Sequence, residues 1–495
     1  MSYLPILKLA APETIVVLTA FIVLAADLLA LRGLEVRFRL LIGAMISCLG
    51  CVLAIGWMLV LPQHQYLLEG LLVVDPLTQC VKISLLVLTI FTLLISAERN
   101  FSVHTGEYFA LILLAATGMM FLVSSEDILM IFLSLELTSL SLYILTAFNK
   151  DSILSAEAAL KYFLFGGMSA AFTLFGLSLL YGLSGATNLR QIASAIHGPE
   201  LEPLLILAMV MTVIGFGFKV AAAPFHLWAP DVYEGAPAPS AAFIASGSKV
   251  AGFFVFAKVM MLGFLGAEGN GAWRHYAPGW VPVLAIIALA SMVLGNLAAI
   301  VQSSVRRLLA YSAIAHGGYM LLAIVANGPQ SLAPLLYYVV TYGLTTLGAF
   351  GVVAVVQEGG GTDQLSGFGG LSKRAPGLSI CMMIFMLSLA GIPPLAGFFG
   401  KFYVFTAALG SGPESLGLLW LVIVAIAMSA VSLYYYLQVL KQIFVVAGPP
   451  QAAELRTPVI TQTALFILAL ATLILGCAPD WLIRPLVTAI KQAGL

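Results

Sequence analysis

The sequence predicts an all-α protein that crosses a membrane many times. Apolar residues make up 61% of the 495 positions and charged residues only 9%, whereas a soluble domain carries about 25% charged residues. Apolar runs of about 20 residues, each long enough to cross a hydrocarbon core of about 30 Å, recur along the whole chain. Lipid leaves no backbone group unpaired, and barrel strands would show about ten-residue alternation instead, so these runs predict helices.

Fourteen membrane-spanning helices are predicted. In chain order they lie near residues 13–31, 40–61, 75–96, 106–124, 127–148, 157–183, 203–229, 239–263, 277–302, 305–326, 332–357, 377–408, 416–444 and 460–485. We expect four regions: residues 1–105 with helices 1–3, 106–263 with helices 4–8, 277–446 with helices 9–13, and 447–495 with helix 14.

The two central regions are predicted to be inverted repeats of five helices. At a constant offset of 176 residues, Tyr143 falls on Tyr319, Tyr162 on Tyr338 and Gly167 on Gly343. Chance similarity between Gly-rich apolar helices explains these three identities equally well.

Proline gives a stronger sign of a repeat, because it removes a backbone donor and clashes with the preceding turn. Helix 7 contains Pro224 and helix 12 contains Pro393 and Pro394, each near a lysine. Both helices are therefore expected to be discontinuous. Copies that start five helices apart run in opposite directions, an architecture typical of ion transporters with broken helices.

The basic residues predict the orientation. One set of connections carries Arg32, Arg37, Arg39, Arg99, Lys150, Arg306, Arg307, Lys373, Arg374 and Arg456. Apart from the termini, the other set carries only Arg190 and Arg274. The richer side should be cytoplasmic and both termini should lie outside.

Five ionisable residues lie inside apolar runs: Glu136, Lys219, Lys249, His316 and Lys401. A charge at the middle of the bilayer costs about 2.5–3.5 kcal/mol on insertion scales, so such residues usually face a protein interior or a wet cavity that has a function. A structural ion pair remains the alternative for Glu136 and the lysines. A hydrogen-bonded core histidine is the alternative for His316.

Other polar residues are given structural roles. Asp27, Lys82, Lys258 and Lys441 lie near the ends of spans and are expected to reach the lipid headgroups. Asp127 should favour the start of helix 5 through the helix dipole. The run of three tyrosines from Tyr434 to Tyr436 predicts an interfacial belt or packing rather than a cofactor site.

A buried lysine and a movable carboxylate could exchange protons. At an effective dielectric constant near 20, such a pair attracts by about 4 kcal/mol at about 4 Å and by about 1.7 kcal/mol at about 10 Å. Separating Glu136 from Lys219 would therefore weaken the hold of the lysine on its proton. Water at the helix breaks could then carry protons between Lys219, Lys249, His316 and Lys401.

The sequence predicts no covalent chemistry on this chain. It contains no nucleophile triad, phosphate loop or dinucleotide motif, and its five cysteines lack the spacing of metal or iron–sulfur ligands. We expect no cofactor and no metal. The zero net charge argues against a nucleic-acid partner.

Several stretches resemble the antiporter-like membrane subunits of respiratory complex I. They are Lys219-Val-Ala-Ala-Ala-Pro-Phe-His-Leu-Trp-Ala-Pro-Asp-Val-Tyr-Glu-Gly-Ala-Pro, Ser246-Gly-Ser-Lys-Val-Ala and Ala310-Tyr-Ser-Ala-Ile-Ala-His-Gly-Gly-Tyr. The helix-12 sequence Gly391-Ile-Pro-Pro-Leu-Ala-Gly-Phe-Phe-Gly-Lys-Phe-Tyr-Val-Phe is similar to the N branch of this family. The M branch has glutamate at the position of Lys401.

The resemblance implies a proton-translocating subunit of a bacterial inner-membrane NADH–quinone oxidoreductase, with both termini periplasmic. It implies that Glu136 and Lys219 form a half-channel pair, that Lys249 connects, and that Lys401 serves the exit. FMN, iron–sulfur clusters and quinone would lie on other subunits, and the M and K subunits would be neighbours. The alternatives are a stand-alone or Mrp-like cation/proton antiporter, the equivalent subunit of a photosynthetic ferredoxin or NAD(P)H–quinone complex, and a purely structural membrane spacer.

Overall fold

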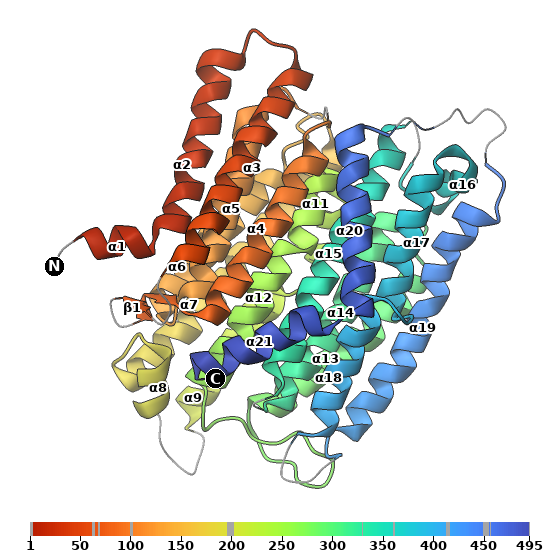
Figure 1. Cartoon of the computed structure of the whole chain (residues 1–495). Helices are drawn as coiled ribbons and strands as arrows, with labels where there is room; N and C mark the ends of the chain where they lie inside the picture. Colours follow the sequence, from red (N-terminus) through yellow and green to blue (C-terminus); the bar gives the residue numbers. More distant parts are fainter. Residues whose placement is uncertain are drawn as a thin grey trace.

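The structure is a computed structural model, and its helices run side by side in one bundle (Figure 1). It describes residues 3–61, 65–67, 70–99, 102–195, 202–328, 330–359, 362–411, 416–448, 455 and 457–494. The long helices are α2 (Ala11–Ala26, continued by η1, Asp27–Leu31), α3 (Val36–Val60), α4 (Pro76–Ser96), α5 (Thr105–Ser124), α6 (Ile128–Thr146), α7 (Ile153–Ser184), α9 (Pro203–Lys219), α12 (Gly247–Lys258, continued by η3, Val259–Gly263), α13 (Trp280–Ile300), α14 (Val305–Ala326), α15 (Leu332–Glu358), α17 (Pro376–Ala390), α18 (Ala396–Leu409), α19 (Leu419–Phe444) and α20 (Val459–Cys477).

Shorter elements lie between these helices and at the ends of the bundle. They are α1 (Tyr3–Leu9), α8 (Leu189–Ala195), α10 (Trp228–Gly235), α11 (Ala238–Ala245), η4 (Leu365–Phe368), α16 (Leu371–Arg374), α21 (Asp480–Ala493) and the antiparallel strands β1 (Gln65–Leu67) and β2 (Leu72–Val74). The all-α membrane fold is thus confirmed, with one small hairpin added.

Within the described residues, twelve helices are long and apolar enough to cross a membrane. Three further apolar helices, α9, α17 and α18, are too short to be identified as membrane spans from their length. They belong to the two segments in which breaks are expected. The count of fourteen crossings therefore stays a prediction.

Both expected breaks are present. Helix α9 ends at Lys219, and residues 220–227, which include Pro224, form turns before α10 begins. Helix α17 ends at Ala390, and residues 391–395, which include Pro393 and Pro394, separate it from α18. Prolines cannot donate to the preceding turn, so the helical hydrogen bonds stop at these points.

The prediction for the last helix is wrong in its length. The expected span of 460–485 ends at Cys477, and α21 then turns to lie crosswise to the bundle (Figure 1). Helix α21 is amphipathic and buries Leu486 and Ile490, whereas Trp481 is exposed. Such a helix is suited to the membrane surface rather than to crossing it.

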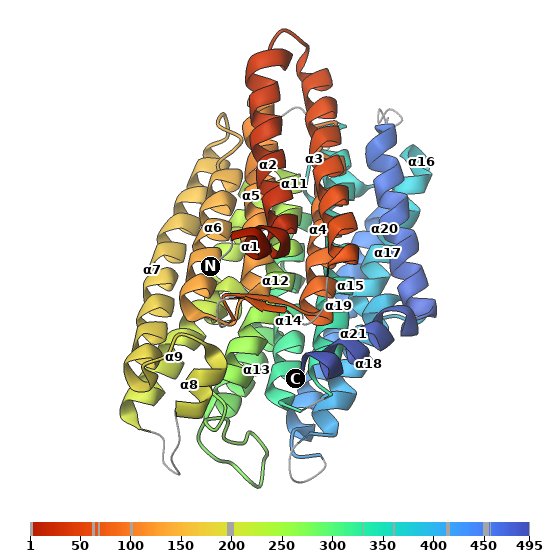
Figure 2. The ribbon, with the colours of Figure 1, turned by 60° about the vertical axis from the view of Figure 1, so that its left-hand side comes forward.

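The most enclosed helices occupy the middle of the bundle. The most apolar 18-residue windows of α15 and of the α11–α12 segment are completely buried within the chain, and that of α14 is 94% buried. In contrast, the upper part of the α2–α3 hairpin rises above the other helices in both views (Figures 1 and 2). Helices that are apolar on all sides are buried ones, so the interior of this bundle is centred on α12, α14 and α15.

Basic residues gather at one end. The connections that carry nine of the ten residues assigned to the cytoplasmic side lie at the upper end in Figure 1, with α16 among them. Arg456 lies outside the described residues. We call this the basic end, and its cytoplasmic location stays a prediction.

Candidate functional site

Glu136 and Lys219 face one small cavity between α6, α7 and α9. Lys219 is the last residue of α9, and its Nζ donates a hydrogen bond to Ser139 Oγ. Ser139 lies three residues after Glu136, on the adjacent turn of α6. The carboxylate and the ammonium interact electrostatically across this cavity. Ser139 therefore holds Lys219 against the helix that carries Glu136.

The position of Lys219 follows from the helix break. The last four carbonyl groups of a helix lack partners and give its end a partial negative charge. Because residues after Lys219 leave the helix, its side chain sits at this negative end. The break thus stabilises an ammonium group that would otherwise be costly to bury.

Lys249 lies beside the same break. Its Nζ donates to the carbonyl oxygen of Ala313 in α14 at 2.5 Å, and the residue is 1% exposed. Gly317 of α14 lies close to both features, because a Cβ atom added to it would stand 3.6 Å from Val220 O and 4.0 Å from Lys249 Nζ. The chain just after Lys219, the lysine of α12 and helix α14 therefore meet.

His316 is bonded to two tyrosines. Its Nδ1 lies 2.8 Å from the hydroxyl of Tyr338 in α15, and its Nε2 lies 3.0 Å from the hydroxyl of Tyr436 in α19. The Tyr436 hydroxyl also bonds Ser312, one turn before the histidine. A satisfied core histidine, the structural alternative, fits these contacts, and so does a proton relay through hydroxyl groups.

Lys401 occupies the second break. Its Nζ donates to the carbonyl oxygens of Leu389 at 3.0 Å and Ala390 at 3.1 Å, at the end of α17. It also donates to Ser429 Oγ at 2.8 Å. The ammonium thus bonds carbonyl groups that the end of α17 leaves without helical partners. Like Lys219, it sits at the C-terminal end of a broken helix.

The five residues form a row across the bundle, from α6 through α9, α12 and α14 to α18. His316 interacts electrostatically with both Lys249 and Lys401. The side chain of Tyr319 lies below Lys401, with its ring centroid 5.2 Å from Nζ. The expected convergence of residues from five separate segments is therefore found in the structure.

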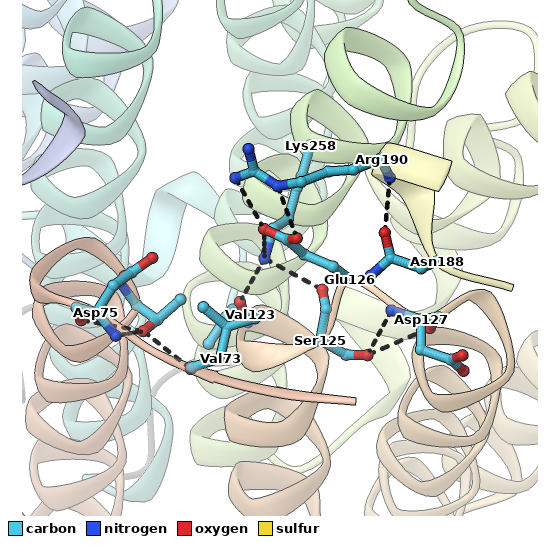
Figure 3. A network of polar contacts seen from close by, with 10 residues as sticks. Val73, Asp75, Val123, Ser125, Glu126, Asp127, Asn188, Arg190 and Lys258 are labelled. Carbon is cyan, nitrogen blue, oxygen red and sulfur yellow. Dashed lines mark hydrogen bonds and ion pairs between the residues drawn. The ribbon is translucent and has the colours of Figure 1, made fainter. Parts of the chain in front are cut away.

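The prediction that Lys258 reaches the headgroups is wrong. The residue is 5% exposed, and its Nζ donates to Ser125 O at 3.1 Å, at the end of α5. Glu126 lies 3.9 Å from it and also accepts from Arg190 at 3.0 Å (Figure 3). Lys258 therefore belongs to a buried network that joins α12 to the α5–α6 connection and α8.

Two more residues assigned to the interface are buried in ion pairs. Lys82 lies 2.6 Å from Glu13 of α2, with side chains 3% and 0% exposed. Asp27 lies 2.7 Å from Arg39. Nearness to a span end does not identify an interfacial residue when a partner from another helix is available. Lys441, in contrast, is exposed in the last turn of α19.

The three tyrosines in α19 divide between the two roles expected for them, an interfacial position and packing. Tyr434 is exposed, but Tyr435 and Tyr436 are buried. The hydroxyl of Tyr435 donates to Asn296 Oδ1 at 2.9 Å, and Tyr436 bonds His316. Asp127, as expected, caps α6, accepting at 3.0 Å from two backbone N–H groups.

Comparisons with known proteins identify the family of the chain. The family model "NADH:quinone oxidoreductase/Mrp antiporter, TM" matches residues 125–429. NADH-quinone oxidoreductase subunit N 2 of Acidobacterium capsulatum is 54% identical over 98% of this chain and 99% of its own length. Among solved structures, a chain of respiratory complex I from Thermus thermophilus is 33% identical, with a TM-score of 0.76 over 96% of this chain and 98% of its own.

A chain of the Mrp complex from Dietzia sp. has a TM-score of 0.81 over 98% of this chain and 97% of its own, but is only 19% identical. This likeness shows a shared fold. The family match covers more than half of the chain, and the relative from Acidobacterium matches nearly all of it. The chain therefore belongs to the NADH:quinone oxidoreductase/Mrp antiporter transmembrane family, among the relatives of NADH-quinone oxidoreductase subunit N.

Proposed function

We propose that this chain is the membrane-arm subunit of an NADH–quinone oxidoreductase that translocates protons through Glu136, Lys219, Lys249, His316 and Lys401. Electron transfer from NADH to quinone in other subunits would drive the movement. The observation that carries the proposal is the row of five ionisable side chains that links the two helix breaks. The subunit N relatives support the choice of complex.

Proton movement would begin with the charge balance at the first break. Lys219 interacts with the Ser139 hydroxyl and with the end of α9, neither of which carries a full charge. The attraction between Glu136 and Lys219 is therefore the interaction that can change. Withdrawing a carboxylate from about 4 Å to about 10 Å costs roughly 2 kcal/mol at an effective dielectric constant near 20. That loss favours transfer of the proton from Lys219 toward Lys249, which lies beside the break.

The second half of the row would receive that charge. Lys249 bonds Ala313 of α14, and His316 of the same helix bonds Tyr338 and Tyr436. A cation that arrives at Lys249 or His316 repels the ammonium of Lys401. Lys401 would then release a proton on the exit side.

The surroundings of the chain belong to the same proposal. We infer a bacterial inner membrane with the basic end in the cytoplasm and both termini in the periplasm, supported by the distribution of arginine and lysine. Residues 106–263 and 277–446 would be inverted repeats, supported by the paired breaks. The M and K subunits would be neighbours, and FMN, iron–sulfur clusters and quinone would be bound by other subunits.

The experiment uses inverted membrane vesicles that contain the whole complex. We expect Lys219→Ala and Lys401→Ala to assemble, to keep NADH oxidation coupled to quinone reduction, and to lose part of the proton pumping that a pH-sensitive dye reports. Ser141→Ala, in which the lost hydroxyl donates to Leu137 O of the same helix α6, is the control for substitution in this region. Wild-type pumping by both lysine variants would refute the proposal.

A further inference from the structure

A polar cleft opens at the basic end of the bundle. Its volume is about 410 Å³, and it lies between the starts of α11 and α14, the end of α15 and the connections before α5 and α7. Two arginines line it although each is almost fully buried, Arg99 at 4% and Arg306 at 6% exposure. Neither residue belongs to the row of five described above.

Both arginines bond backbone carbonyl groups around the cleft. Arg306 Nε donates to Tyr233 O at 2.8 Å and so fixes the end of α10. Arg99 Nη1 donates to Ala354 O at 3.0 Å, but its Nε and Nη2 have no hydrogen-bond partner among the described residues. Buried N–H groups are nearly always bonded, so water that enters the open cleft is the expected partner.

A face of α15 leads from this cleft to Lys249. Tyr342, Thr346, Phe350 and Ala354 follow one another at intervals of four residues, which places them on one side of the helix. Ala354 lines the cleft, and the ring of Tyr342 lies 5.7 Å from Lys249 Nζ. Tyr342 and Ala354 are separated by twelve helical steps of about 1.5 Å, or about 18 Å along the helix axis.

Three buried hydroxyl groups stand along this face. The ring of Tyr233 packs on Phe350 with centroids 5.7 Å apart, and Tyr233 also interacts with Tyr342. The hydroxyls of Tyr342 and Thr346 interact with each other, and neither these two nor the hydroxyl of Tyr233 has a further hydrogen-bond partner among the described residues. Each of these residues is at most 3% exposed. Water bonded to such groups is the usual way to satisfy them.

We propose that the cleft is a second entrance for protons, which reach Lys249 through water held by the hydroxyls of Tyr233, Thr346 and Tyr342. This entrance bypasses Glu136 and Lys219, and it rests on the proposed function of the row. It would supply protons to the centre of the molecule from the basic end. Only protons move along it, and no bond other than O–H and N–H is made or broken.

The first test blocks the cleft. Gln357 is half-buried and lines it, so Gln357→Cys is treated with a cationic methanethiosulfonate reagent in inverted vesicles that oxidise external NADH. We expect labelling to reduce proton pumping while NADH oxidation continues. Ser366→Cys, at an exposed position of the same end outside the cleft, should be labelled without this loss. Failure of the reagent to reach Gln357→Cys, or complete labelling with unchanged pumping, would overturn the proposal.

The second test removes single hydroxyl groups. Tyr233→Phe and Tyr342→Phe should lower the number of protons pumped per NADH oxidised. Tyr337→Phe is the control, because that buried hydroxyl donates to Leu475 O at 2.7 Å, away from the cleft. Equal pumping in all three variants contradicts the second entrance. Lys219→Ala and Lys401→Ala measured in parallel separate the outcomes: a pumping defect in these variants with an ineffective block refutes the entrance alone, whereas wild-type pumping by both variants refutes the proposed function.

Discussion

Ser139 offers the sharpest test of the first proton step, because it contacts Lys219 and lies one turn from Glu136. In Ser139→Ala the lysine loses a hydroxyl acceptor in a buried site. A hydrogen bond to a charged group contributes about 1.5–3 kcal/mol, and leaving the donor buried without a partner forfeits that amount. Since 1.36 kcal/mol is a factor of ten, the equilibrium for placing a proton on Lys219 should fall by about 10- to 150-fold.

The measurement is NADH-driven proton pumping in inverted vesicles, together with NADH oxidation in the same preparation. We expect Ser139→Ala to pump fewer protons per NADH and Ser139→Thr, which keeps a hydroxyl, to recover much of the loss. Ser141→Ala is the matched control on the same helix. If Ser139→Ala pumps as the wild type does, the hydroxyl plays no part in holding Lys219 and the reasoning about this pair is refuted.

Two further predictions concern the breaks and the buried ion pairs. Gly391→Ala should impair pumping in an assembled complex. The residue has φ +86°, and an added Cβ would stand 3.4 Å from Lys401 Nζ. Gly410→Ala, with its nearest contact at 3.6 Å, is the control, and equal pumping by the two would contradict this role. Lys82→Met should destabilise the purified complex by about 3–5 kcal/mol because Glu13 is left buried without its partner. The double variant with Glu13→Gln should recover most of that loss in thermal unfolding, and no recovery would mean that the pair is not the cause.

The helix breaks and the stranded charges could be predicted from the sequence because their signals are local. Proline disrupts its own helix whatever surrounds it, so Pro224, Pro393 and Pro394 sufficed to place the two interruptions. A charged residue in the middle of an apolar run is visible without knowledge of its neighbours. These local signals identified the five ionisable residues of the row but not the side chains that connect them.

The connections depend on contacts between helices, which the sequence does not display. Ser139 and Ser141 both bond the carbonyl four residues earlier in α6, as serine commonly does in helices. Only the position of α9 makes one of them a partner of a lysine. In the same way, Lys82 and Glu13 are far apart in the sequence, and distance from a span end gave no sign that α2 and α4 bring them together.

The two lysines at the helix breaks share one electrostatic arrangement but differ in what can change it. A helix end presents a partial negative charge of about half an electron, and that charge is fixed. Lys219 has, in addition, a carboxylate in Glu136, whereas the contacts of Lys401 among the described residues are carbonyl groups, Ser429 and the face of Tyr319. A proton can therefore be displaced from Lys219 by moving a negative charge away. In the proposed pathway, Lys401 is instead driven by a positive charge that arrives at His316 or Lys249, so we expect transfer across the centre of the row to precede release at its end.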